Sequence, residues 1–197
     1  MTFPQRRSKG VGGVLGVGLL LVVLGAVPVA AAPCLVPSSA YPTIQAAVND
    51  ATCNIINVAA GTYNENVVID RKVMIGGAGE ESTIIDGSGS GPVFSIGNGS
   101  DTPGKSMVTI TGVTIQNGRS DFGAGISNSG TLTVTDSTIS GNTAVSGGAI
   151  DNAGPLTILN STISGNSATA AGGAIHNGGS AATLTVINST ISGNTGG

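Results

Sequence analysis

The sequence NSTISGN occurs at residues 160–166 and again at 188–194, and the variant DSTISGN occurs at 136–142. The isoleucines at the centre of these copies, together with one that precedes them, follow one another at intervals of 24, 24 and 28 residues: Ile115, Ile139, Ile163 and Ile191. A repeat of this length, built from short apolar runs separated by turn residues, is typical of a β-solenoid in which each repeat forms one coil. The period therefore predicts the architecture before any single residue is considered.

One repeat forms three short strands when its apolar residues are placed on the inner face. Leu132 and Val134 point inward with the period of two that a strand imposes, and Ile139 points inward from a second strand. The Gly-rich stretch 147–150 is predicted to be the third strand, with Ile150 inward. Three strands and three turns complete one coil, and successive coils of parallel strands then stack about 4.8 Å apart.

Equivalent residues of successive coils form columns, and two of these columns are polar. One contains Asn128, Asn152 and Asn177, and the other contains Asp136, Asn160 and Asn188. We expect both columns to turn inward at corners of the coil, where each amide bonds a backbone group and the same amide of the next coil. These asparagines are therefore predicted to be structural ladders, with a ligand or metal ladder as the alternative.

The first 32 residues have the features of a secretory signal peptide. A basic start with Arg6, Arg7 and Lys9 precedes an apolar stretch at 11–29 and a small-residue cleavage site at 30–32. We predict that this segment is cleaved and that the protein is secreted, extracellular or bound at the cell surface. A retained transmembrane anchor is the alternative.

The two cysteines, Cys34 and Cys53, are predicted to form a structural disulfide, because an even cysteine count in an exported protein favours pairing. Two unpaired small core residues are the alternative. Residues 33–54 then form an N-terminal cap with a short amphipathic helix near 43–51, which Thr43 caps. Irregular first coils follow at 55–106, and regular repeats occupy 107–197 and end without a cap.

The composition excludes two classes of partner. All ten acidic residues follow residue 32, against four of the seven basic residues, which leaves this part of the chain with a net charge of −6. Nucleic acids and anionic membranes are therefore not expected as partners. The chain has no Trp, and only Tyr41, Tyr63, Phe94 and Phe122 supply aromatic rings after residue 32.

Two stretches resemble known families. The sequence YPTIQAAV at 41–48, followed by INVAAGTYNE at 56–65, resembles the N-terminal cap and first coil of right-handed parallel β-helix proteins of the pectin-lyase-like superfold. The Gly-Gly-Ala-Ile repeats with ISGN at 139–142 resemble polymorphic outer-membrane protein repeats, with Ile in place of their aromatic residue. The resemblance implies an all-β fold: a right-handed parallel β-helix with three sheets, about 24 residues per coil and a short N-terminal capping helix.

The same resemblance implies two enzyme activities to consider, those of pectinesterases and of pectate lyases. Residues 61–65 match the Gly-x-Tyr-x-Glu block of pectinesterases, but the Gln-Asp and Arg-Pro-Trp motifs of that family are missing, so we interpret the block as a turn with a buried Tyr. Pectate lyases hold calcium with clustered Asp residues beside an Arg base. Arg119 and Asp121 are neighbours here, yet Asp136 and Asp151 fall on different faces and no column of carboxylates exists.

One outward row, Ser127, Asp151 and His176, contains the residue types of a catalytic triad. Its order excludes that role, because His must lie between the nucleophile and the carboxylate. An Asp151–His176 surface pair is expected instead. The irregular stretch 71–119, whose acidic residues include Glu80, Glu81, Asp86 and Asp101, is where any activity would first be sought.

These observations predict a non-catalytic secreted or cell-surface β-helix repeat protein with a structural, adhesive or binding role, without cofactor or metal. The alternatives are a polysaccharide-active enzyme of the pectate lyase or pectinesterase type, and the truncated N-terminal part of a larger adhesin or autotransporter. The sequence does not identify the partner; a surface polysaccharide and another protein are the two candidates. End-to-end self-association through the uncapped C-terminal coil is a further hypothesis, because an uncovered sheet edge favours pairing.

Overall fold

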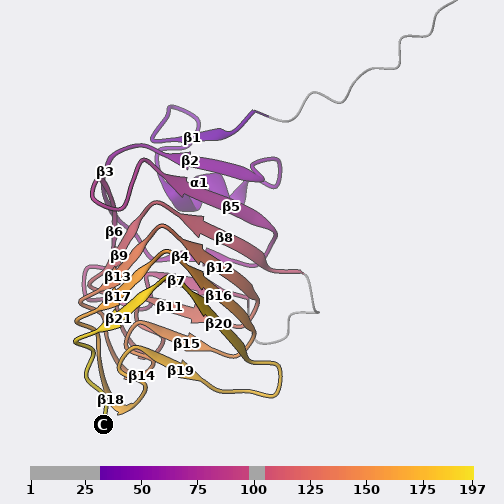
Figure 1. The fold of residues 1–197 in the computed structure, drawn as a ribbon. Coiled ribbons are helices and arrows are strands. Elements are labelled where there is room, and N and C mark those ends of the chain that lie inside the picture. Colours follow the sequence, from indigo (N-terminus) through magenta and orange to yellow (C-terminus); the bar gives the residue numbers. More distant parts are fainter. Residues whose placement is uncertain (1–31, 98–104) are drawn as a thin grey trace, which may run out of the picture. The chain divides into compact units, whose positions relative to one another are not determined.

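The computed structural model describes residues 32–97 and 105–197, and within them the chain forms a parallel β-solenoid (Figure 1). Each strand pairs in parallel with the equivalent strand of the next coil, as Ile139 does with Ile163. The strands therefore stack into sheets that run along the solenoid, while the chain turns from sheet to sheet within each coil. The predicted solenoid of about 24 residues per coil is confirmed.

The described strands form four sheets. Sheet A contains β1 (Cys34–Val36), β2 (Ile55–Val58), β5 (Val73–Gly77), β8 (Met107–Thr111), β12 (Thr131–Thr135), β16 (Pro155–Leu159) and β20 (Thr183–Ile187). Sheet B contains β3 (Gly61–Asn64), β6 (Thr83–Asp86), β9 (Thr114–Gln116), β13 (Thr138–Ser140), β17 (Thr162–Ser164) and β21 (Thr190–Ser192). Sheet C contains β4 (Val67–Ile69), β7 (Phe94–Ile96), β11 (Ile126–Asn128), β15 (Ile150–Asn152) and β19 (Ile175–Asn177). Sheet D contains β10 (Arg119–Phe122), β14 (Thr143–Ser146) and β18 (Ser167–Ala171).

Sheet D adds a fourth strand to the three that were predicted for each regular coil. It occupies the stretch after Asn142, and the strand that was predicted at 147–150 is shifted to β15, which begins at Ile150. Gly147 lies in the turn before β15 with a φ of +66°, and a Cβ added there would lie 2.5 Å from the carbonyl oxygen of Ile150. The glycines therefore make a tight turn between sheets D and C, which a residue with a side chain could not make.

The interior is a stack of aliphatic side chains, as the columns predict. Leu132, Ile139 and Ile150 point inward from sheets A, B and C, and all three are fully buried. In sheet B, Ile139 lies in register between Ile115 and Ile163, so each coil covers the apolar residues of its neighbours. A core this narrow depends on every coil supplying its share of apolar surface.

Residues with a left-handed backbone form the corner between sheets A and B. Asp136, Asn160 and Asn188 have φ values of 47°, 47° and 50°, and Gly112 takes the equivalent place one coil earlier with 64°. Gly, Asn and Asp are the residues that adopt this conformation most readily. The first residue of each NSTISGN or DSTISGN copy is thus explained by the backbone geometry of a corner.

Helix α1 (Ile44–Asn49) lies beside the first coils and is shorter than the predicted span of 43–51. The Thr43 hydroxyl accepts a hydrogen bond from the backbone N–H of Ala46 at 3.0 Å, which is the predicted N-cap. Its apolar face, formed by Ile44, Ala47 and Val48, is buried in the core. No helix among the described residues is long and apolar enough to cross a membrane.

A disulfide joins Cys34 to Cys53 and thereby links β1 to the segment between α1 and β2. Cys53 is buried in the core cluster, and Cys34 packs against that cluster. The bond closes a loop with a sequence separation of 19 residues, and the loop contains the whole helix. A cross-link of this length restricts the unfolded chain and stabilises the cap through that restriction.

Removing this disulfide should lower the stability of the N-terminal cap. We expect the double variant Cys34→Ala/Cys53→Ala to lose about 3 kcal/mol of unfolding free energy, measured by urea denaturation. Intact-mass analysis of the wild-type protein, isolated from an oxidising environment, should show both thiols oxidised. Free thiols at both positions, or lipid attached to Cys34, would contradict the assignment.

Candidate functional site

The first predicted asparagine column lies on the inner side of sheet C. The side-chain amide of Asn128 donates to Oδ1 of Asn152 at 2.6 Å, and that of Asn152 donates to Oδ1 of Asn177 at 2.7 Å. Asn128 and Asn152 are buried, and Asn152 also donates to the carbonyl of Gly154 at 2.7 Å. The amides of Asn128 and Asn152 are therefore occupied by the ladder and by the backbone and are not available to a ligand, whereas Asn177 at the end of the ladder is exposed.

The second predicted column does not turn inward, so the orientation expected for Asn160 and Asn188 is wrong. Asp136, Asn160 and Asn188 are exposed at the corner between sheets A and B, because their left-handed backbone directs the side chain outward. One bond of 3.3 Å, from the Asn160 amide to Oδ1 of Asp136, links neighbouring members. The buried polar column of this corner is formed one residue later, by the hydroxyls of Ser137, Ser161 and Ser189.

The structure contains a third asparagine ladder, which was not predicted from the sequence and which makes the most hydrogen bonds of the three. It contains Asn142, Asn166 and Asn194, the last residue of each copy of the motif. Asn166 Oδ1 accepts bonds from the backbone N–H and the side-chain amide of Asn142 at 3.0 and 2.9 Å. Its own amide donates to Oδ1 of Asn194 and to the carbonyl of Ile139, both at 2.9 Å. The signal for it was the invariant final Asn of the repeat.

The Gly-x-Tyr-x-Glu block has a structural part in the cap. The two carboxylate oxygens of Glu65 accept the backbone N–H groups of Ile44 and Gln45 at 2.9 and 3.0 Å, at the start of α1. Tyr63 donates its hydroxyl proton to the carbonyl of Ala59 at 3.0 Å. Because the first N–H groups of a helix lack partners within it, Glu65 completes the helix end.

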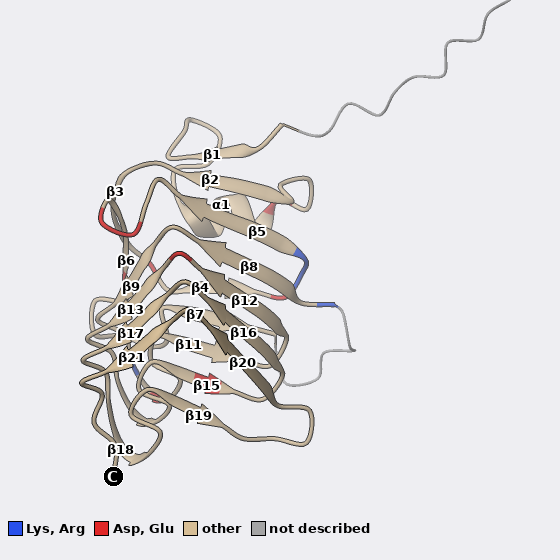
Figure 2. Ribbon diagram, viewed as in Figure 1, with Lys and Arg blue, Asp and Glu red and all other residues tan. Residues whose placement is uncertain are grey.

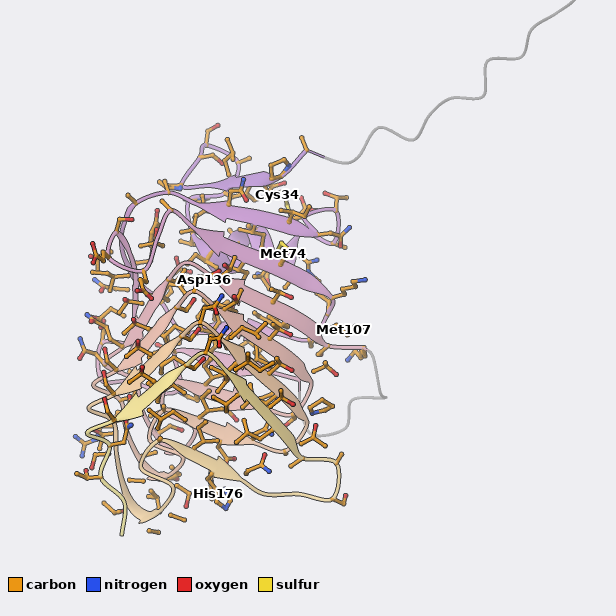
Figure 3. The ribbon with its side chains drawn as sticks, viewed as in Figure 1. Cys34, Met74, Met107, Asp136 and His176 are labelled. Carbon is orange, nitrogen blue, oxygen red and sulfur yellow. A yellow bond between two sulfur atoms is a disulfide. The ribbon has the colours of Figure 1, made fainter. Side chains whose placement is uncertain are left out.

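The outward row on sheet C has the predicted order. Ser127, Asp151 and His176 pair in register on β11, β15 and β19, with Asp151 between the other two. His176, labelled in Figure 3, has its Nδ1 2.6 Å from Oδ1 of Asp151. The imidazole of His176 thus contacts Asp151 and not Ser127. Ser127 has no histidine beside it to take its proton, so this row does not form an activated nucleophile.

Two polar hollows, of about 380 and 520 Å³, lie where the turn after β6 passes over sheet D. Gly89, Arg119 and Thr143 line both of them. Asp86 lines the smaller hollow, and burial by itself would raise the pKa of its carboxyl group. Hydrogen bonds that Asp86 accepts from Gln116, the backbone N–H of Ser88 and Asn117 outweigh the burial and lower that pKa. The carboxylate is thus held ionised by amides, which does not suit a general acid.

The remaining acidic residues of the irregular stretch are not brought together. Glu80 accepts a bond from the hydroxyl of Thr138 at 3.1 Å on sheet B, while Glu81 is exposed. Asp101 lies outside the described residues. In the described part of the chain, no group of three or more His, Cys, Asp or Glu residues is arranged to hold a metal ion.

Like the outer face of sheet B, the outer face of sheet A carries regular rows of polar side chains. Its central column consists of outward threonines that pair in register on β8, β12, β16 and β20: Thr109, Thr133, Thr157 and Thr185. Further outward threonines flank this column: Thr111, Thr131, Thr135 and Thr183. We call these eight residues the threonine face. Within the described residues, no hydroxyl of the central column has a hydrogen-bond partner in the protein.

The threonine face is free of charged side chains. Figure 2 shows β8, β12, β16 and β20 without acidic or basic residues, and the nearest charges lie at turns beside the strands. A hollow of about 470 Å³ lies at the N-terminal end of this face. Its lining includes the apolar Ile55, Met74 and Met107, the charged Lys72, and Thr109, Thr131 and Thr133 of the face itself. Figure 3 places Met74 on β5 and Met107 at the start of β8. The face therefore presents hydroxyl and methyl groups in rows. Its margins carry Met74 and Met107 together with Lys72 at the N-terminal end and Asp136 at the corner, where Thr135 donates to the Asp136 carboxylate at 3.1 Å.

Comparison with known proteins identifies the repeat region. A family model described as a right handed beta helix region matches residues 53–197. No curated protein and no solved structure matches the chain.

Proposed function

We propose, from the premise that this chain belongs to the right-handed β-helix family, that it is an exported, non-catalytic binding protein whose binding surface is the threonine face. The observation that carries the proposal is the column Thr109, Thr133, Thr157 and Thr185, which repeats one side chain at the same place on four successive coils. Identical groups at a constant spacing present the same contact many times. They are suited to a ligand that is itself repetitive, because each weak contact is then multiplied.

The disulfide supports export. Bridges between cysteines persist in oxidising compartments and are rare where thiols are kept reduced. The bond between Cys34 and Cys53 therefore fits a protein that works outside the cytoplasm. The likeness of the Gly-Gly-Ala-Ile repeats to outer-membrane protein repeats extends this proposal to a cell-surface or adhesin setting.

A polysaccharide-active enzyme is the second candidate, and the described contacts favour it less. Glu65, the acid of the esterase-like block, is bonded to the start of α1, and Asp151 lies between Ser127 and His176. Acid–base chemistry needs groups that converge on one reacting atom. The hollow that contains Asp86 and Arg119 is the place where such chemistry would be expected if it exists.

We expect no lyase or esterase turnover on polygalacturonate, methylated or not, with or without calcium. Release of unsaturated products, reducing ends and methanol should stay at the level of the buffer. Turnover by the wild-type protein that is lost on Asp86→Ala would contradict the non-catalytic proposal and assign the activity to the hollow over sheet D.

Binding to repetitive solids tests the proposal directly. The folded wild-type protein should adsorb to at least one of microcrystalline cellulose, crystalline chitin and ice, and the adsorption should depend on the threonine face. The double variant Thr133→Lys/Thr157→Lys places two long charged side chains in the central column and should abolish adsorption. Its control, Thr143→Lys/Thr169→Lys, adds the same charge to exposed positions of sheet D on the same two coils and should adsorb like wild type. Equal adsorption by both variants would exclude the threonine face.

A further inference from the structure

We propose that the repetitive ligand of the threonine face is ice, so that the protein binds and restrains ice crystals. This inference rests on the proposed function, since it uses the same face, and it adds the chemical identity of the ligand. Three observations support it: the spacing of the threonines, the absence of protein partners for the hydroxyls of the central column in the described structure, and the absence of aromatic and charged residues from the four strands.

The spacing of the central column follows from the parallel pairing of its strands. Thr109, Thr133, Thr157 and Thr185 are direct register partners. Neighbouring parallel strands lie about 4.8 Å apart, and outward residues along one strand lie about 6.6 Å apart, two residues at about 3.3 Å each. Thr131, Thr133 and Thr135 show the second spacing within β12. The face is therefore a two-dimensional array of hydroxyl and methyl groups.

Ice has a comparable repeat. In a tetrahedral lattice with hydrogen bonds of about 2.75 Å, second-neighbour oxygens lie about 4.5 Å apart, because the angle at each water is tetrahedral. The mismatch with the coil spacing is about 0.3 Å per row, and about 0.9 Å over the three intervals of the column, well below one hydrogen-bond length. The perpendicular repeat of the lattice, about 7.3 Å, is less close to the 6.6 Å along the strands. The spacing of the threonines therefore matches the ice lattice more closely along the column than along the strands.

The hydroxyls of the central column are available to a water lattice. In the described structure they have no protein partner, so each must bond to water. Sheet B has its own outward threonines, and there the hydroxyls of Thr114 and Thr138 bond to the carbonyl and the carboxylate of Glu80. Thr162 and Thr190 of the same column have no protein partner for their hydroxyls in the described structure, so sheet B is occupied over its first two threonines alone. The turn after β5 thus occupies part of sheet B, whereas the equivalent part of sheet A is open.

The chemistry of the face favours ice over a crystalline polysaccharide. Binding sites for sugars commonly use aromatic rings as stacking surfaces. The four described strands of the face contain no aromatic residue and no charged residue. Uncharged hydroxyls join a water lattice as donors and acceptors, and the methyl groups beside them lose exposed apolar surface when an ice plane covers them.

The test compares ice binding by wild type and the two lysine variants as full-length exported proteins. Wild type should slow the recrystallisation of ice in a frozen sucrose solution and should facet single crystals held just below melting. Thr133→Lys/Thr157→Lys should lose both effects, and Thr143→Lys/Thr169→Lys should keep both. Circular dichroism melts establish that each variant is folded. Should the lysine variant of the face fail to fold, Thr157→Leu replaces it, because Leu159 and Ile187 already occupy outward positions of this sheet.

The outcomes separate the two proposals. Adsorption to cellulose or chitin that depends on the threonine face, without any effect on ice, would overturn the inference and leave the proposed function standing. Ice activity that persists when Thr133 and Thr157 are replaced would overturn the inference, because it would place the ice-binding groups elsewhere. A folded wild-type protein that binds none of the three solids would overturn both.

Discussion

Replacing Ile163 by aspartate will unfold the coils on either side of it. Ile163 is fully buried, and it lies in register between Ile139 and Ile191 in the aliphatic interior behind sheet B. A carboxylate at this position has no cation and no donor, and burying an unpaired charge costs far more than losing the isoleucine. We expect the unfolding free energy to fall by more than about 4 kcal/mol. Thermal denaturation followed by far-UV circular dichroism will measure the change.

The control for this prediction is the adjacent residue. Thr162 pairs with Thr138 and Thr190 on the outer side of the same sheet, where water solvates a new charge. Thr162→Asp should therefore change the unfolding free energy by less than about 1 kcal/mol. Equal shifts of the melting temperature in the two variants would mean that the inside and outside of this strand are reversed.

The second large effect is expected at Asn166, which ends the NSTISGN copy at 160–166. Asn166→Ala removes a side chain that accepts two bonds from Asn142 and donates to Asn194 and to the carbonyls of Ile139 and Ser164. Asn142 is buried, so its backbone N–H would lose a partner that water cannot replace, while its amide keeps the carbonyls of Ile115 and Ser140. The Oδ1 of Asn194 and the carbonyl of Ile139 would each lose a donor as well. With about 1–3 kcal/mol for each orphaned group, partly relieved by relaxation, we expect a loss of about 3–5 kcal/mol in urea denaturation.

The other asparagine of the same motif copy supplies the control. Asn160 is exposed, makes one side-chain bond of 3.3 Å and has a left-handed φ of 47°. Gly112 occupies the equivalent corner in an earlier coil, so Asn160→Gly keeps a residue that accepts this backbone. Its stability should stay within about 1 kcal/mol of wild type. Comparable losses at both asparagines would contradict the distinction between a buried ladder and an exposed corner.

Much of the fold could be predicted because the repeat length and the apolar positions are visible in the chain. The 24-residue interval between Ile139 and Ile163 is the register of β13 on β17 in the structure. Inward Leu132 and Ile150 follow from the period of two in their strands. The extra strand β14 could not be predicted, because its residues Thr143–Ser146 have one buried alanine and no apolar alternation of their own. β14 forms because its backbone pairs in parallel with β10 on one side and with β18 on the other.

The candidate site was less visible in the sequence. The sequence shows the repeated threonines of the face, but the threonines of sheet B repeat at the same intervals, so the sequence cannot distinguish the two sets. The contacts of Glu80 distinguish the first threonines of the two columns, since they occupy Thr114 and Thr138 on sheet B and leave Thr109 and Thr133 on sheet A open. The sequence predicted that the block containing Glu65 is structural, but only the bonds to Ile44 and Gln45 show its part, which is to complete the N-terminal end of α1.

The sequence by itself determined that this protein is a stack of β-coils with an aliphatic interior, because a strict period and alternating apolar residues leave one way to bury the isoleucines. Only the tertiary structure decided which asparagines are buried. Asn160 and Asn166 are the same residue type in one seven-residue motif. A left-handed φ directs Asn160 outward, whereas the turn at Gly165 between β17 and β18 places Asn166 in the ladder. The tertiary structure also decided which threonine hydroxyls stay open, because that depends on a loop from another coil, which no local pattern records.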